Sequence, residues 1–240
     1  MYMNPWKSIL AAPSFVINLD RCKWRLSATL SRVQNAGFTN VKRFSAIDAS
    51  NPKLLEEKWD ALGKPLKNSI FDPEFLTFLG KQGVCLSQIF LWKKIVDEQI
   101  PISTIFEDDV MFHPQWEELA PLYWGQTPPS WDILFIGSQH EFNSTFHVDK
   151  GPVFCLHAYI ITLEGAKRLL NNVLSRPGGL YTIDTMLKVE MDLNTKSFQW
   201  YVWNGKLFPC SEAEMPNGWS KRNNGLVFQD ESFGTDVRPW

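Results

Sequence analysis

The chain has 240 residues, of which 44% are hydrophobic and 21% charged, and its formal net charge is −2. This composition is typical of a folded globular protein and excludes a disordered chain. The slightly acidic balance argues against a protein that binds nucleic acid by neutralising phosphates. No apolar run is long enough to span a bilayer, and residues 1–8 lack a basic segment followed by an apolar stretch. We therefore expect neither a transmembrane segment nor a signal peptide.

The predicted strands and helices alternate along the chain. Short β-branched runs predict strands, and apolar residues at helical spacing predict helices. The predicted strands span residues 14–19, 41–44, 102–106, 131–136, 153–162 and 198–203. The predicted helices span residues 21–36, 84–98, 164–174 and 185–191, with loop and short helices over 50–80. This order predicts an α/β fold with a mostly parallel central sheet and helices on both faces. Ligands of such sheets bind beyond the carboxyl ends of the strands.

Three consecutive carboxylates, Glu107, Asp108 and Asp109, follow the predicted strand 102–106. Alternate side chains of a strand share a face, so we expect Glu107 and Asp109 to point one way and Asp108 the other. Two oxygen ligands on one face suit Mg²⁺ or Mn²⁺, which also bind the phosphates of a nucleotide. A solvated acidic turn is the plainer interpretation, but the apolar strand before the triplet favours the metal site.

Polar residues also follow the first predicted strand, namely Asn18, Asp20, Arg21 and Arg25. At a strand-to-helix turn such groups can bind a base or a ribose, and arginine can reach phosphate. The plainer interpretation, in which Asp20 caps the helix and the arginines lie on its surface, is favoured from these residues alone. There is no GxGxxG or GxxxxGK[ST] motif, so neither a dinucleotide fingerprint nor a P-loop is supported.

The other candidate catalytic groups are isolated in the sequence. The four histidines show no HExxH spacing, and there is no GxSxG motif, which argues against nucleophilic hydrolases. His157 lies in an apolar predicted strand and is expected to be a hydrogen-bonded core residue. Asp184 follows a loop and is either the N-cap of a helix or a general base for an acceptor hydroxyl. The four cysteines form no CxxC pair, and we expect them to be reduced and mostly buried.

Five blocks of the sequence resemble the family 25 glycosyltransferases in content and order. The blocks are VINLDR at 16–21 with Arg25, RFSAID at 43–48, GKQGVCLSQ at 80–88 with Trp92, IFEDDV at 105–110, and HAYIITLEGA at 157–166 with Leu169 and Leu170. Each block alone is weakly specific, whereas their order over residues 14–190 is fairly specific. The family includes lipooligosaccharide β-galactosyltransferases and collagen hydroxylysine galactosyltransferases.

This resemblance implies a GT-A-like fold and an inverting transfer of a hexose, galactose favoured, from a UDP-sugar to a hydroxyl group. The acceptor would be a glycan or glycoconjugate, such as lipopolysaccharide core, protein hydroxylysine or a viral or capsular glycan. Glucose and N-acetylglucosamine are the alternative donor sugars. The resemblance further implies that Glu107 and Asp109 bind Mn²⁺ or Mg²⁺, and that Asp184 is the catalytic base. The residues implied in binding the nucleotide sugar are Asn18, Arg25, Asp48, Lys81, Gly83, Ser87, Gln88 and Asp108.

We expect residues 1–204 to form a single GT-A-like catalytic domain. Residues 205–240 would be a C-terminal extension, which could cover the donor site as a flap and add positive charge through Lys221 and Arg222. Trp131, Trp203 or Trp219 could stack on the acceptor sugar, although core packing is the plainer role. We expect a cytoplasmic enzyme of a bacterium or a virus-infected cell that binds no nucleic acid. Peripheral contact with a membrane is compatible with the sequence.

One departure from the family pattern leaves an alternative function open. The family usually has Ser-His where this chain has Ser87-Gln88, and glutamine forms hydrogen bonds but cannot carry a proton as imidazole does. A decayed transferase that binds a nucleotide sugar or a carbohydrate without turnover is therefore the second hypothesis. A metal-dependent phosphohydrolase is the third, and the lack of a second Asp and His cluster argues against it.

Overall fold

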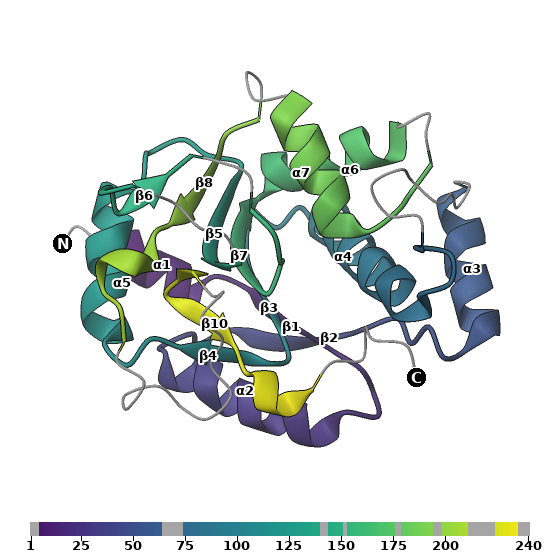
Figure 1. Ribbon diagram of the computed structural model, residues 1–240, viewed down its shortest axis with the longest axis horizontal. Helices are drawn as coiled ribbons and strands as arrows, with labels where there is room; N and C mark the ends of the chain where they lie inside the picture. The colour runs from purple at the N-terminus through teal and green to yellow at the C-terminus, as the bar shows by residue number, and fades with distance from the viewer. Residues whose placement is uncertain are drawn as a thin grey trace.

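A central sheet with helices on both sides forms the body of the protein (Figure 1). The computed structural model describes residues 5–63, 74–139, 144–150, 153–175, 179–193, 198–210 and 224–234. No helix among these residues has the length and apolar character needed to cross a membrane.

The main sheet has the strand order β2-β1-β3-β7-β5-β8-β6, and β9 pairs with β5. Strands β1, β2, β3, β5 and β8 run in one direction, while β7, β6 and β9 run against them. A second, two-stranded sheet is made by β4 and β10. The strands are β1 Ser14–Asn18, β2 Val41–Ser45, β3 Ile102–Glu107, β4 Val110–Phe112, β5 Ile133–Ser138, β6 Val148–Asp149, β7 Ala158–Thr162, β8 Trp200–Trp203, β9 Asn224–Gly225 and β10 Val227–Gln229.

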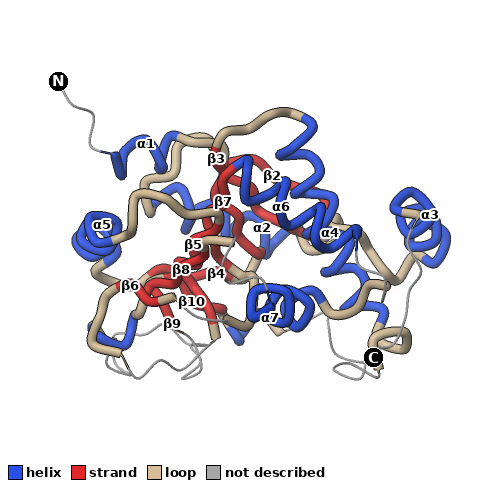
Figure 2. Tube along the Cα trace, turned by 90° about the horizontal axis from the view of Figure 1, so that it is seen from above, coloured by secondary structure: helices blue, strands red, loops and turns tan. Residues whose placement is uncertain are grey.

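The helices cover both faces of this sheet, as the two views show (Figures 1 and 2). Helices α4, α6 and α7 lie on one face with α3 beside α4, whereas α1, α2 and α5 lie on the other. The helices are α1 Pro5–Ala11, α2 Lys23–Asn35, α3 Pro52–Leu62, α4 Leu79–Asp97, α5 Trp116–Gln126, α6 Leu163–Ser175 and α7 Ile183–Leu193, with short 3₁₀ turns at Gly205–Leu207 and Glu231–Phe233. The predicted α/β fold with a mostly parallel central sheet and helices on both faces is confirmed.

The central strands divide their side chains between two hydrophobic cores. On β1, Ile17 packs with the core under α4 and α6, while Val16 packs with the core under α2 and α5. On β3, Ile105 and Phe106 divide in the same way. This is the two-residue period of a strand buried on both sides, and it explains why these strands are almost continuously apolar.

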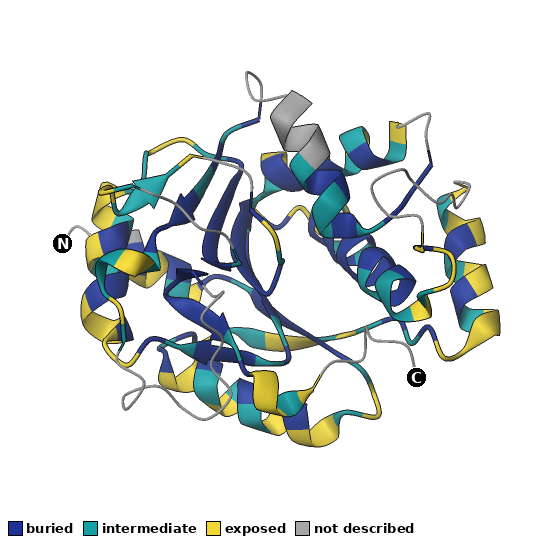
Figure 3. Cartoon of the chain, in the orientation of Figure 1, coloured by how far each residue is buried: buried dark blue, intermediate teal, exposed yellow. Residues whose placement is uncertain are grey.

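Two helices differ from their predicted boundaries or faces. Helix α4 begins at Leu79, before the expected residue 84, and it is buried on nearly every side instead of being amphipathic (Figure 3). It is covered by the sheet and by α3, α6 and α7, so its polar residues are enclosed along with its apolar ones. On α2, Arg25 is buried, contrary to its expected position on the helix surface, and the neighbouring Trp24 is 58% exposed.

Three local interpretations around the site were wrong. The strand expected over 153–162 covers only Ala158–Thr162, since Cys155 has a φ of +66° that interrupts an extended chain. Asp20 does not cap α2, because its carboxylate accepts hydrogen bonds from Arg43 and Ser45. Asp184 lies within the first turn of α7 and is not its N-cap.

The last described segment, residues 224–234, pairs with strands of both sheets. It adds β9 to β5 and β10 to β4, and it is held to α2 by an ion pair between Asp230 and Arg32 at 2.7 Å. Whether residues of the extension act as a flap stays a prediction.

Candidate functional site

A cavity of about 510 Å³ opens at the carboxyl ends of β1 and β3. This volume is within the usual range for small-molecule sites. All the residues predicted to bind the metal, to bind the nucleotide sugar or to act as the catalytic base line it, although they come from five separate segments of the chain. They are Asn18, Arg25, Asp48, Lys81, Gly83, Ser87, Gln88, Glu107, Asp108, Asp109 and Asp184. The structure therefore brings the whole predicted set together, and their individual roles stay predictions.

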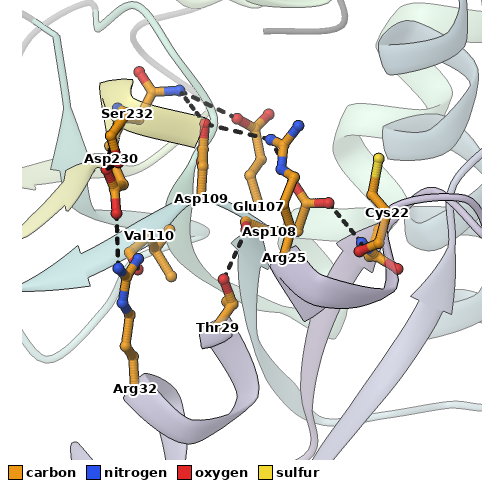
Figure 4. Close-up of polar contacts among 12 residues, drawn as sticks. Cys22, Arg25, Thr29, Arg32, Glu107, Asp108, Asp109, Val110, Asp230 and Ser232 are labelled. Atoms are coloured by element: carbon orange, nitrogen blue, oxygen red, sulfur yellow. Dashed lines mark hydrogen bonds and ion pairs between the residues drawn. The ribbon is translucent and has the colours of Figure 1, made fainter. Parts of the chain in front are cut away.

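The three carboxylates of the acidic triplet separate into a pair and a single residue (Figure 4). The Nε2 atom of Gln229 donates to Glu107 at 3.4 Å and to Asp109 at 3.5 Å, so these two carboxylates lie side by side. Asp108 is instead bound by Arg25 at 2.7 Å and by the Nδ2 atom of Asn18 at 2.6 Å. The expected separation is present, but strand alternation is not its cause, because β3 ends at Glu107 and the next two residues form a turn.

The paired carboxylates are largely buried, and this changes their acidity. Burial, followed by repulsion from Asp109, raises the pKa of Glu107 well above its usual value. Burial also raises the pKa of Asp109 to about 7, although the guanidinium of Arg25 opposes the shift. The Oδ1 atom of Asp109 is buried and has no hydrogen-bond partner among the described residues. Such a pair binds a positive charge favourably, because a cation offsets both the free-energy cost of burying the two ionised carboxylates and the repulsion between them.

This donor set fits a divalent cation that is shared with a ligand. No group of three or more histidine, cysteine, aspartate or glutamate side chains in the described part of the chain could hold a metal alone. Mg²⁺ and Mn²⁺ are commonly bound by one or two carboxylates, with water and substrate phosphates as the remaining ligands. Glu107 and Asp109 supply two hard oxygen donors of this kind.

The carboxyl ends of β1 and β2 carry a connected polar network beside the acidic triplet. The side chain of Asn18 donates to Asp108 and to the carbonyl of Cys22, and its Oδ1 atom accepts from Arg43 at 3.0 Å. Asp48 forms an ion pair with Arg21. Asn18 therefore holds the acidic triplet in place relative to β1.

Helix α4 supplies the wall of the cavity that faces the loop after β2. Ser87 donates to the carbonyl of Gly83 at 2.6 Å and accepts from the backbone N–H of Ile47 at 2.8 Å. A side chain at Gly83 would come within 2.7 Å of the Ile47 carbonyl, so only glycine permits this close approach. The loop that carries Asp48 is thus seated against α4 by Gly83 and Ser87.

Asp184 and Cys155 also line the cavity, within electrostatic range of the acidic triplet. The charge of Asp184 contributes to the raised pKa values of Glu107 and Cys155. Asp184 therefore lies close enough to the acidic pair to interact with it electrostatically. A carboxylate at this place can accept a proton from a hydroxyl group bound in the cavity.

Of the other residues singled out in the sequence, some lie in the core and some lie outside the described residues. Trp203 is fully buried in the core, and Trp131 packs against Trp124, so neither faces the cavity. Trp219, Lys221 and Arg222 lie outside the described residues. His157 is buried, and its Nε2 atom lies 3.0 Å from the carbonyl of Val227, which confirms the predicted core role. All four cysteines are free as predicted, but Cys85 is the only buried one.

Two functional residues are missed by the sequence analysis. Gln229 bridges the acidic pair although it lies 120 or more positions along the chain, and Arg43 holds Asn18 from the neighbouring strand. No local signal marks Gln229, since its role depends on β10 pairing with β4. Arg43 could have been found because it belongs to the RFSAID block. That block begins within strand β2, which pairs with the β1 strand of the VINLDR block.

The chain is similar to two solved glycosyltransferase structures. A glycosyltransferase involved in glycosylation of the major capsid of PBCV-1 has 10% sequence identity and a TM-score of 0.46, with 81% of this chain and 82% of that chain covered. Mouse xyloside xylosyltransferase 1 has 12% identity and a TM-score of 0.38, with 84% of this chain and 80% of that chain covered.

Curated relatives match over much of this chain but over a smaller part of their own. A glycosyltransferase 25 family member of Anopheles gambiae is 28% identical over 74% of this chain and 31% of its own length. Human procollagen galactosyltransferase 2 is 24% identical over 92% of this chain and 39% of its own length. The chain thus spans about a third of the length of these relatives.

A protein-family model also matches the chain. Residues 11–150 match the model described as glycosyltransferase family 25 (LPS biosynthesis protein). The match covers more than half of the chain and includes the ends of β1, β2 and β3 with the acidic triplet. The chain belongs to glycosyltransferase family 25.

Proposed function

We propose that this protein transfers a hexose, with galactose favoured, from a UDP-sugar to a hydroxyl group of a glycan or glycoconjugate, with inversion and with a divalent metal. The observation that carries the proposal is the buried pair Glu107 and Asp109 at the wall of a cavity at the carboxyl ends of the strands. Family membership and the galactosyltransferase name of a relative support the choice of reaction.

The leaving group of such a transfer is a nucleoside diphosphate, so the site must stabilise negative charge. Glu107 and Asp109 would hold Mn²⁺ or Mg²⁺, and the ion when bound supplies positive charge to the diphosphate. The first turn of α4 also lines the cavity and contains no acidic residue, so the positive end of the helix dipole and Lys81 favour the same ligand.

The proposed roles of the other residues follow from their contacts. Arg25 neutralises Asp108 and keeps it oriented toward the ribose or the donor sugar. Asp48, seated by Gly83 and Ser87, would bind the nucleotide. Asp184 would accept the proton of the acceptor hydroxyl as that oxygen attacks the anomeric carbon from the face opposite the diphosphate.

Thermal stabilisation by a panel of UDP-sugars, with Mn²⁺ and with EDTA, tests the proposal. A ligand at 100 times its Kd adds about 2.7 kcal/mol of stability, which gives a readily visible rise in Tm. We expect a rise with one UDP-hexose that needs Mn²⁺ and is lost in Asp109→Asn. Asp97→Asn is the matched control, because it changes an exposed carboxylate on α4 that pairs with Lys93 away from the cavity.

The same panel distinguishes the competing functions. Binding that is independent of Mn²⁺ and unchanged in Asp109→Asn would refute the proposed role of the acidic pair. Binding without any transfer across a set of acceptors would favour the decayed transferase. Release of phosphate from nucleotides faster than sugar transfer would favour the phosphohydrolase.

A further inference from the structure

A chain of hydrogen bonds runs from the core to the cavity through Trp92, Tyr159 and Gln88. The indole Nε1 of Trp92 donates to the hydroxyl of Tyr159 at 2.8 Å, and that hydroxyl donates to Oε1 of Gln88 at 2.6 Å. Gln88 and Trp92 lie one turn apart on α4, and Tyr159 lies on β7. None of these side chains is more than 1% exposed.

Chemistry dictates the direction of this chain. An indole N–H only donates, so the oxygen of Tyr159 must accept from Trp92. The single hydroxyl hydrogen of Tyr159 is then left for Gln88, and burial raises the pKa of Tyr159 so that this hydrogen is retained. If the amide nitrogen faced Tyr159 instead, the hydroxyl oxygen could accept from it, but the hydroxyl hydrogen would then have no acceptor among the described residues. The atom of the Gln88 amide that faces Tyr159 is therefore its oxygen.

The orientation of the amide oxygen decides what Gln88 presents to the cavity. Gln88 lines the cavity, whereas Tyr159 and Trp92 lie behind it. With the oxygen held by Tyr159, the planar amide directs its NH₂ group away from Tyr159. Among the described residues none accepts a hydrogen bond from this nitrogen.

We infer that Gln88 is a specificity-determining residue that offers only N–H donors to the cavity and therefore selects a ligand oxygen that accepts hydrogen bonds. The inference rests on the proposed function, in which the ligand is a UDP-sugar. The accepting oxygen belongs either to the diphosphate or to the sugar. Tyr159 and Trp92 are positioning residues, because they orient the amide without touching the ligand.

Three substitutions of Gln88 test whether this residue acts as a hydrogen-bond donor to the ligand. The measurement is calorimetric titration of UDP and of UDP-galactose with Mn²⁺ present. Gln88→Glu replaces the donor by an acceptor, so Kd should rise about 10- to 100-fold, whereas Gln88→Met only removes the donor and should raise Kd about 5- to 10-fold. Gln88→His should bind within about 3-fold of the wild type, because one ring nitrogen accepts from Tyr159 and the other donates to the cavity. Equal losses for both ligands would assign the oxygen to the diphosphate, and a loss confined to UDP-galactose would assign it to the sugar.

Tyr159→Phe tests the positioning role, with Tyr123→Phe as a matched control. Tyr123 is also buried, and its hydroxyl donates to the Asn204 carbonyl at 2.6 Å away from the cavity. Both variants lose one buried hydroxyl and should lose similar stability. Only Tyr159→Phe should raise Kd and KM for the donor, by about 5-fold, with a smaller change in kcat.

The outcomes separate this inference from the proposed function. A wild type that binds UDP-galactose while Gln88→Glu binds it equally well would overturn the inference and leave the proposed function standing. A wild type that binds neither UDP nor UDP-galactose would overturn the proposed function. It would also overturn the identification of a UDP-sugar as the ligand that Gln88 selects. In that case a double-mutant cycle of Tyr159→Phe and Gln88→Met in urea unfolding still tests the hydrogen bond. We expect a coupling of about 5-fold in the unfolding equilibrium constant, and no coupling would refute the hydrogen bond between Tyr159 and Gln88 on which the orientation of the amide depends.

Discussion

Replacing Gly83 by alanine tests the contact that seats the Asp48 loop against α4. The added Cβ would lie 2.7 Å from the Ile47 carbonyl and 3.2 Å from the Cβ of Ala49, so the loop or the helix must move. Alanine in a helix interior gains about 1 kcal/mol over glycine, whereas overpacking of this kind costs about 1–3 kcal/mol. We expect a net loss of about 1 kcal/mol in the free energy of unfolding.

Gly125 in α5 supplies the matched control, because nothing lies within 4 Å of a Cβ added there. Gly125→Ala should keep the helix gain of about 0.5–1 kcal/mol, so the two variants should differ by about 2 kcal/mol in urea unfolding. Gly83→Ala should also weaken UDP binding, since it displaces the loop that carries Asp48. A Gly83→Ala protein that is as stable as Gly125→Ala and binds UDP normally would refute this account of the cavity wall.

Three further predictions concern buried side chains and one ion pair that stabilise the fold. Burial lowers the pKa of His157 to about 4, so below pH 6.5 the unfolded chain binds a proton that the folded chain does not. The free energy of unfolding should therefore fall by about 2 kcal/mol more in the wild type than in His157→Gln between pH 7 and pH 5, and parallel urea series at both pH values check this. Asp230→Ala breaks the ion pair with Arg32 and should cost about 2 kcal/mol, whereas Asp97→Ala, at an exposed pair, should cost under about 0.5 kcal/mol, as measured by urea unfolding. Trp203→Ala removes a fully buried indole and should cost about 3–5 kcal/mol; a smaller loss in thermal unfolding would contradict its core role.

Apolar, β-branched runs in the sequence predict strands β1, β2, β3, β5, β7 and β8, whereas the short strands β4, β6, β9 and β10 are not predicted. The apolar, β-branched runs at 14–18 and 102–107 can bury both of their faces only inside a sheet covered by helices. Asn18 and Glu107 then lie at neighbouring strand ends, because β1 and β3 are parallel and adjacent. Local pattern singled out Asn18, Arg25, the acidic triplet and Asp184. The other predicted cavity residues, Asp48, Lys81, Gly83, Ser87 and Gln88, were assigned only by the resemblance to the family.

Tertiary structure alone decided the elements whose stability comes from distant partners. No helix is predicted over Trp116–Gln126, yet α5 forms there although Pro121 and Gly125 are poor helix formers. The burial of Trp116 and Tyr123 against the sheet outweighs that local cost.

The same holds for the electrostatics and hydrogen bonding of the site. Arg25 is buried because Asp108 lies beside it, and Gln229 reaches the acidic pair because β10 pairs with β4. The orientation of the Gln88 amide depends on Tyr159, which lies 71 positions away in the chain. These contacts join segments that are far apart in the sequence. Local residue patterns, which extend over one strand or a few helical turns, therefore cannot predict them.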